Sequence, residues 1–129
     1  MKIGELARAT ATKVETVRFY EKSGLLPAPG RTAGNYRAYG AGHLARLSFI
    51  RRARDLGFSL DQVRALLNLS DDRARPCGAV DEIASAQLAA VDRKIADLTA
   101  LRRELASLLD QCSRGTIADC RIIDALAPG

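Results

Sequence analysis

The stretch from Ala79 to Gln111 constrains the fold more than any other part of the chain, because it contains neither Gly nor Pro. It is rich in Ala, Leu, Arg and acidic residues, which lose little side-chain entropy in a helix. Propensity alone therefore predicts one long helix. Its apolar residues recur in steps of three and four, close to the spacing of a coiled-coil seam: Val80, Ala84, Leu88, Val91, Ile95, Leu98, Leu101, Leu105 and Leu108.

A narrow apolar stripe on so long a helix must be buried, either on its own domain or against a partner helix. Too little chain remains to cover it, so we predict a second copy. Cys77 precedes the helix and Cys112 follows it. Their separation of 112 − 77 = 35 residues is ~52 Å along a helix, so these thiols cannot meet in one chain. In an antiparallel two-fold dimer, Cys77 of one subunit would face Cys112 and Cys120 of the other.

Length and hydropathy limit the domain organisation of the protein and its expected cellular location. The 129 residues allow a small domain with an extension. No apolar run is long enough for a transmembrane helix, and the start, MKIGELARAT, lacks the apolar core of a signal peptide. We therefore expect a cytoplasmic protein without a membrane partner. A structural disulfide is disfavoured there, so the three cysteines are expected to be free thiols or metal ligands.

Positive charge is concentrated in the first half of the chain. Residues 1–69 hold 12 Lys+Arg against 5 Asp+Glu, a balance of 12 − 5 = +7, whereas residues 70–129 hold 8 against 10, a balance of −2. A basic small domain predicts a polyanionic partner, most often nucleic acid. The alternative is that the charge serves solubility alone.

Two short helices are expected at the start of the chain, over Lys2–Ala9 and Val14–Ser23. A polar break at Thr10–Thr12 separates them, which matches a helix-turn-helix whose second helix enters a major groove. Gly24 stands where a helix-ending glycine is expected, and Pro27 prevents continuation. The outer face of the second helix would carry Lys13, Glu15, Thr16 and Arg18.

The segment Gly30–Tyr39 (GRTAGNYRAY) follows and predicts a small β-wing. Its Gly-Asn pair favours a turn, and the flanking tyrosines suit strands. Arg31, Arg37 and Tyr36 on such a wing would contact the phosphate-sugar backbone of a nucleic acid. The alternative is a solvated loop with its aromatics packed inward, which we favour for Tyr39.

Two further helices complete the first half. One is predicted over Ala41–Leu56, with most of its arginines on a solvated face and with His43 in a structural role. The next begins at a capping box formed by Ser59 and Gln62 and runs to about Leu69.

This pattern divides the chain into four segments. Residues 1–69 are predicted to form a winged helix-turn-helix domain that would bind DNA, and residues 70–78 a linker. Residues 79–111 form the long helix. Residues 112–129 form a loop between two cysteines and a short C-terminal helix.

The cysteines predict soft-metal chemistry, because thiolates favour copper(I), zinc, cadmium, mercury and lead. Three thiolates would suit a divalent cation, and the two of the Cys112–Cys120 loop would suffice for linear copper(I). A tetrahedral zinc site would need a further ligand, for which Asp119 or water would serve. The alternatives are small buried apolar residues or a thiol redox regulator. An enzyme or a structural zinc protein is disfavoured, because no Cys-x-x-Cys, Cys–His pair or phosphate-binding loop is present.

Three segments together resemble the MerR family of bacterial transcription regulators: IGELARATATKVETVRFYEKSGLL, GNYRAY and LARLSFIRRARDLGFSLDQVRALL. The resemblance implies a mostly α fold, in which a winged helix-turn-helix domain is followed by a long antiparallel coiled-coil dimerisation helix and a short metal-binding loop. It also implies a homodimer on palindromic promoter DNA. Inducer binding would distort and underwind that DNA so that RNA polymerase can start transcription. In this family branch the transcribed genes would serve heavy-metal resistance.

The resemblance also implies roles for single residues. The recognition helix would bind DNA through Lys13, Arg18 and Tyr20, and the wing through Arg31, Tyr36 and Arg37. The metal ligands would be Cys77, Cys112 and Cys120.

Family members that sense copper(I) have Ser in place of Cys77, so its Cys implies the divalent branch, which responds to mercury, lead, cadmium or zinc. The adjacent Cys77–Gly78 pair is similar to lead and cadmium sensors, and the extra loop ligands of zinc sensors are missing. The loop of seven residues between Cys112 and Cys120 has the length of copper(I) members, which leaves monovalent sensing open.

Overall fold

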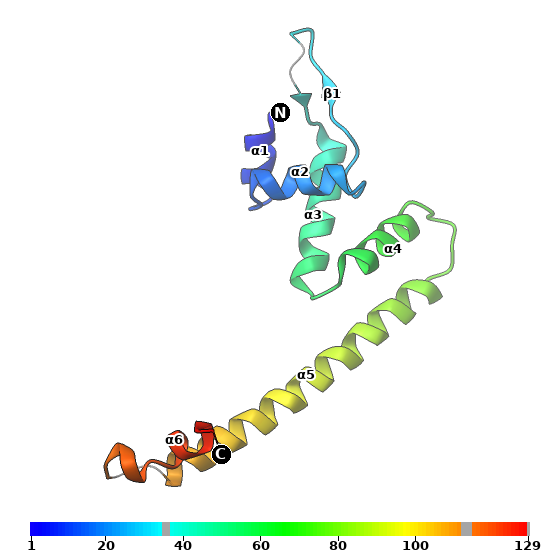
Figure 1. The fold of residues 1–129 in the computed structure, drawn as a ribbon. Coiled ribbons are helices and arrows are strands. Elements are labelled where there is room, and N and C mark those ends of the chain that lie inside the picture. Colours follow the sequence, from blue (N-terminus) through cyan, green and yellow to red (C-terminus); the bar gives the residue numbers. More distant parts are fainter. Residues whose placement is uncertain (35–36, 112–114, 129) are drawn as a thin grey trace. The chain divides into compact units, whose positions relative to one another are not determined.

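The structure, a computed structural model, describes residues 1–34, 37–111 and 115–128. Figure 1 shows a helical chain with one small two-stranded sheet. The elements are α1 (Ile3–Ala9), α2 (Val14–Lys22), β1 (Gly30–Arg31), β2 (Arg37–Ala38), α3 (Ala41–Asp55), α4 (Leu60–Ser70), α5 (Gly78–Gln111), the 3-10 helix η1 (Ile117–Asp119) and α6 (Arg121–Leu126). They form two compact units, Met1–Ile83 and Ala84–Gly129. The described helices include none that is both long and apolar enough to cross a membrane.

The first unit has a single apolar core built by α1 to α4. In α2, Val17 and Tyr20 are three residues apart and so lie on the same face of the helix, and both are buried. Ile83, in the second turn of α5, packs against the same core. The side chains that are almost fully excluded from solvent are Leu6, Val17, Leu25, Leu26, Leu47, Ile50 and Val63.

The predicted turn between α1 and α2 is present and is tightly bonded. The Thr10 hydroxyl donates to the carbonyl of Leu6 at 3.0 Å. Ala11 has a φ of 50°, in the left-handed region that costs an L-residue about 1–2 kcal/mol. Arg51 of α3 donates from Nη1 to the carbonyls of Thr10 and Ala11, at 2.6 and 2.7 Å. The strained turn is therefore held from outside by an arginine of another helix.

The arginines of α3 largely face solvent, as predicted, because Arg52 and Arg54 are exposed and the Arg51 side chain is 41% exposed. Three of the four also bond to backbone carbonyls, which was not predicted. Besides Arg51, Arg46 donates to the Leu25 carbonyl at 2.8 Å and Arg54 to the Phe58 carbonyl at 2.7 Å. Arg64 of α4 likewise donates to the carbonyl of Ser23, at the end of α2, at 2.8 Å. These guanidinium groups satisfy carbonyls that end helices and turns, because such carbonyls have no partner within their own element.

The wing is present as the antiparallel pair β1 and β2, with Gly30 opposite Ala38 and Arg31 opposite Arg37. The expectation that Tyr39 packs inward is confirmed, because its side chain is buried and its hydroxyl donates to the Glu21 carboxylate of α2. The turn residues Asn35 and Tyr36 lie outside the described residues.

The capping box before α4 is confirmed. The Ser59 hydroxyl accepts from the backbone N–H of Gln62 at 3.2 Å, and the Gln62 side chain accepts from the N–H of Ser59 at 2.8 Å. The helix ends at Ser70, one residue beyond the predicted end.

Helix α5 begins at Gly78, one residue earlier than predicted, and continues without a break for 34 residues. At 1.5 Å per residue its length is about 51 Å. Large apolar side chains remain exposed along it, at 55 to 65% of their surface: Leu88, Ile95, Leu98, Leu101, Leu105 and Leu109. All of these except Leu109 belong to the predicted seam, so a single chain leaves much of that seam uncovered, as expected if a second copy covers it.

Candidate DNA-binding surface and metal-ligating cysteines

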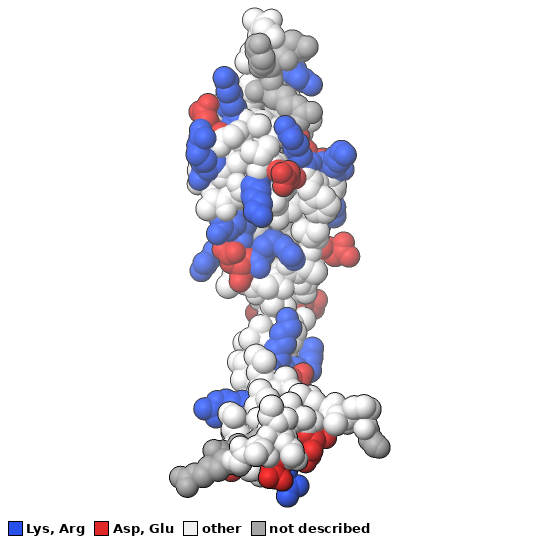
Figure 2. Space-filling view, turned by 60° about the vertical axis from the view of Figure 1, so that its left-hand side comes forward, with Lys and Arg blue, Asp and Glu red and all other residues white. Residues whose placement is uncertain are grey.

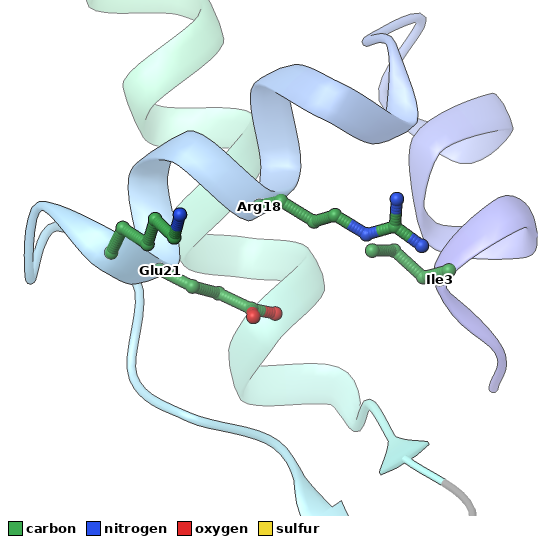
Figure 3. A pocket seen from close by; sticks show the side chains of 4 residues that line it. Ile3, Arg18 and Glu21 are labelled. Carbon is green, nitrogen blue, oxygen red and sulfur yellow. The ribbon is translucent and has the colours of Figure 1, made fainter.

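The recognition helix α2 presents two of the predicted DNA contacts to solvent. Lys13 directly precedes the helix and Arg18 lies in its middle, and both residues are exposed. Figure 3 shows the Arg18 side chain extending from α2 toward Ile3 of α1. Together with Glu21 and Lys22 these residues line a shallow hollow of about 460 Å³. Lys22 was missed by the sequence reasoning, although its position four residues after Arg18 puts it on the same helix face.

Tyr20 has different surroundings from Lys13 and Arg18, because only 8% of its surface is exposed. Its ring packs in the core and lies 5.9 Å from the ring of Phe19, centroid to centroid. The phenol therefore holds α2 on the core, and DNA contact by Tyr20 stays a prediction. Phe19, the residue before it in α2, is half exposed.

On the wing, Arg31 of β1 is exposed and its backbone lies opposite that of Arg37 in β2. Tyr36 lies outside the described residues, as does the side chain of Arg37. The register nevertheless brings the two arginine positions to adjacent strands. Lys and Arg side chains are spread over the first unit on the face shown in Figure 2, in agreement with the charge balance of the sequence.

Cys77 has a free, exposed thiol in the first unit. Its carbonyl accepts the N–H of Asp81 at 3.0 Å, which places it at the start of α5. It borders a pocket of about 410 Å³ that the sequence did not reveal, because the lining comes from α3, α4, the following loop and α5. The other lining residues are Phe49, Leu66, Leu69, Ser70, Asp72, Arg73, Arg75, Pro76 and Val80.

Cys120 lies in the second unit, between η1 and α6, and is partly buried. It is disulfide-bonded, which differs from the expectation that no disulfide is present. Cys112 lies outside the described residues. Within the described parts of the chain, no group of three Cys, His, Asp or Glu side chains gathers as a metal site. Three ligands from one chain are therefore not brought together among these residues.

The fold and these surfaces define a class of protein, a winged helix-turn-helix transcription regulator with an attached dimerisation helix. Two family models match the chain: "MerR HTH family regulatory protein" over residues 1–70 and "MerR, DNA binding" over residues 44–108. The chain is 40% identical, over all 129 residues and 88% of the relative, to the HTH-type transcriptional regulator HmrR of Sinorhizobium medicae (strain WSM419). It is 39% identical, with the same coverage, to the heavy metal-dependent transcription regulator 2 of Rhizobium meliloti (strain 1021).

The crystal structure of the transcription regulator PbrR691 from Ralstonia metallidurans CH34 in complex with lead(II) is similar, with a TM-score of 0.84 and 46% identity. The match covers 98% of this chain and 99% of that one. The chain belongs to the MerR family of transcription regulators. It is a metal-responsive member, and it binds promoter DNA as a dimer. Its relatives named above are transcription regulators rather than enzymes.

Proposed function

We propose that this regulator senses a divalent soft metal, namely mercury, lead or cadmium and less readily zinc, at a site shared between two subunits. The ligands are Cys77 of one subunit and Cys112 and Cys120 of the other. One observation carries the proposal: a thiol precedes an unbroken helix of about 51 Å and the other two follow it. An antiparallel pair of such helices brings opposite ends together.

The exposed seam of α5 supports this pairing, since its apolar side chains need a partner of equal length. Three thiolates carry three negative charges, which a divalent cation neutralises better than a monovalent one. The resemblance to a lead(II)-bound regulator along nearly the whole chain supports lead among the candidates. Because Cys120 is disulfide-bonded, metal binding requires reduction of that bond first. Asp119 or water would complete a fourth coordination position.

A second candidate is a copper(I) sensor that uses only Cys112 and Cys120. It is favoured by the seven-residue loop between them, which has the length found in copper(I) members of the family. Linear copper(I) needs only these two thiolates and no contribution from Cys77. A thiol redox regulator on the same fold is the third, favoured by the disulfide at Cys120.

The metal signal acts on DNA through the first unit. In the proposal, Lys13, Arg18 and Tyr20 bind through the recognition helix, and Arg31, Tyr36 and Arg37 bind through the wing. Metal binding distorts and underwinds the operator, so that RNA polymerase in the cytoplasm engages the promoter and transcription is activated. The pocket beside Cys77 is lined by residues of α3 and α4. A movement of Cys77 on metal binding would therefore act directly on these two helices of the DNA-binding unit.

The first test is a titration of the reduced dimer with mercury, lead, cadmium, zinc and copper(I), in wild type and Cys77→Ser. Thiolate-to-metal absorption reports stoichiometry and promoter transcription reports response. Binding of a divalent ion with activation, both lost in Cys77→Ser, supports the three-thiolate site. Activation by copper(I) that is indifferent to Cys77→Ser refutes it in favour of the two-cysteine loop. A response to oxidant in the absence of metal would instead support the redox regulator.

A subunit-mixing experiment tests whether the site spans the interface. Neither Cys77→Ser nor Cys112→Ser homodimers should bind metal at full affinity. A heterodimer of the two contains one intact site if the ligands come from both subunits, so it should regain half of the wild-type stoichiometry. No recovery in a verified heterodimer would show that each site is built within one chain.

DNA contacts are tested separately from metal binding. Arg18→Ala should weaken operator binding while leaving the metal titration unchanged, because Arg18 is exposed on α2 and far from the cysteines in sequence. The affinity of the wild type should fall steeply with salt, since phosphate neutralisation releases counterions. Loss of metal affinity in Arg18→Ala would contradict the assignment of two separate sites.

A further inference from the structure

His43 is the only histidine of the chain, and it lies where the wing joins helix α3. It is the third residue of α3, and the residue as a whole is partly buried. The ring makes an edge contact with Tyr39, with 5.3 Å between centroids. Neither metal binding nor the predicted DNA contacts account for a histidine at this place.

Both ring nitrogens of His43 lie within hydrogen-bonding distance of the backbone. The N–H of Gly40 donates to Nδ1 at 3.1 Å, so Nδ1 carries no proton. Nε2 lies 3.2 Å from the carbonyl oxygen of Pro27, and only a protonated Nε2 can donate to it. The two bonds together require the neutral ring with its single proton on Nε2.

These two bonds hold both ends of the wing. Pro27 lies in the segment that enters β1, and Gly40 lies in the segment that leaves β2. Tyr39, between β2 and Gly40, is itself bonded to Glu21 of the recognition helix α2. His43 thus connects the wing, through Tyr39, to the helix that carries the predicted DNA contacts Lys13 and Arg18.

We propose that His43 is a positioning residue for operator binding, which sets the wing against the recognition helix only in its neutral form. Protonation places an N–H at Nδ1, facing the N–H of Gly40, so the bond at that end of the wing is lost. The proposal rests on DNA binding by the first unit and is independent of which metal the protein senses.

The charged groups near the wing have hydrogen-bond partners of their own. The Met1 amino group donates to the Tyr39 carbonyl, the Glu21 carboxylate accepts from the Tyr39 hydroxyl, and Arg46 donates to the Leu25 carbonyl. Added positive charge on a DNA-binding domain would by itself strengthen attraction to phosphates at low pH. The proposal predicts weaker operator binding at low pH, which is the opposite of this charge effect, so the two effects are distinguishable.

Helix α4 of the same chain provides the design of the control variant. There Gln62 stands at the third helical position and accepts the N–H of the residue before the helix at 2.8 Å. His43→Gln therefore keeps an acceptor for the Gly40 N–H but cannot titrate. His43→Ala removes both bonds. Far-UV circular dichroism and thermal unfolding verify that each variant folds.

The experiment measures operator affinity of the full-length dimer between pH 5.5 and 8, where histidine ordinarily changes charge. Wild-type affinity relative to His43→Gln should fall roughly three- to tenfold toward the acidic end, the factor expected for one hydrogen bond. His43→Ala should be weaker than His43→Gln at every pH, by a constant factor. Nitrogen-15 spectra of the wild-type ring at pH 8 should show a bare Nδ1 and a protonated Nε2.

Three results would overturn the proposal. They are parallel pH profiles of wild type and His43→Gln, a wild type that binds relatively more tightly at low pH, and a spectrum with the proton on Nδ1. The spectrum decides the tautomer on the unmodified protein, so the test holds even if a variant folds poorly.

Discussion

The arginine that holds the helix-turn-helix should be worth more to stability than its neighbour on the same helix. Arg51 donates two hydrogen bonds to the turn carbonyls of Thr10 and Ala11, at 2.6 and 2.7 Å, and pairs with Asp55 at 3.5 Å. Arg51→Ala removes all three contacts. Arg52→Ala is the matched control, because it removes the same charge from the next position, where the side chain is exposed.

The expected cost follows from the contacts. A hydrogen bond with a charged donor contributes about 1.5–3 kcal/mol when buried. Here the Arg51 side chain is 41% exposed, so water replaces part of that energy. The Asp55 pair adds only about 0.3–0.5 kcal/mol, as exposed pairs within a helix do. The expected loss in the free energy of unfolding is about 2 kcal/mol for Arg51→Ala and under about 0.5 kcal/mol for Arg52→Ala.

Urea unfolding of the first unit, followed by tyrosine fluorescence at equal protomer concentration, measures the difference. With a slope near 1–2 kcal/mol per molar urea, the Arg51→Ala midpoint should fall by about 1–2 M. Operator affinity should fall with it, since the turn sets the angle of α2. Equal midpoints for the two variants would refute the reasoning, because the carbonyl bonds would then contribute nothing beyond charge.

Three other changes test separate parts of the fold. Ala11→Gly should stabilise the protein by about 0.5–1 kcal/mol, because it relieves the φ of 50° at some entropic cost, and a lower melting temperature would contradict this. Ser59→Ala should cost about 1 kcal/mol in urea unfolding by removing the cap of α4, and no change would mean that water replaces the hydroxyl. Leu101→Lys should raise the dimer dissociation constant more than tenfold in sedimentation equilibrium, because Leu101 is 55% exposed on the single chain and lies on the predicted seam; an unchanged constant would place the dimer contact elsewhere.

Features decided by neighbouring residues were predicted well from sequence. The length of α5 follows from an unbroken run of helix formers, and the start of α4 follows from Ser59 and Gln62, three positions apart. The spacing of the cysteines on either side of α5 predicts a site between subunits, and that site stays a prediction.

Features decided by contacts between residues far apart in the sequence were not predicted. Arg51 bonds to carbonyls 40 and 41 positions away, and Arg46 bonds to one 21 positions away. The DNA contact that the family resemblance assigns to Tyr20 stays a prediction, although the residue is buried. Lys22, which lines the same hollow as Arg18, was overlooked. The pocket at Cys77 needs side chains from three helices and a loop.

The sequence by itself determined the helices, the turn, the capping box, the basic first half and the uncovered seam of α5, because propensity, capping and periodicity act over a few residues. Only the tertiary structure decided which polar side chains face solvent and which hold the backbone. An arginine on an amphipathic helix has the same local pattern in both cases. What distinguishes Arg51 from Arg52, or gives His43 its tautomer, is the nearby backbone that folding brings within hydrogen-bonding distance.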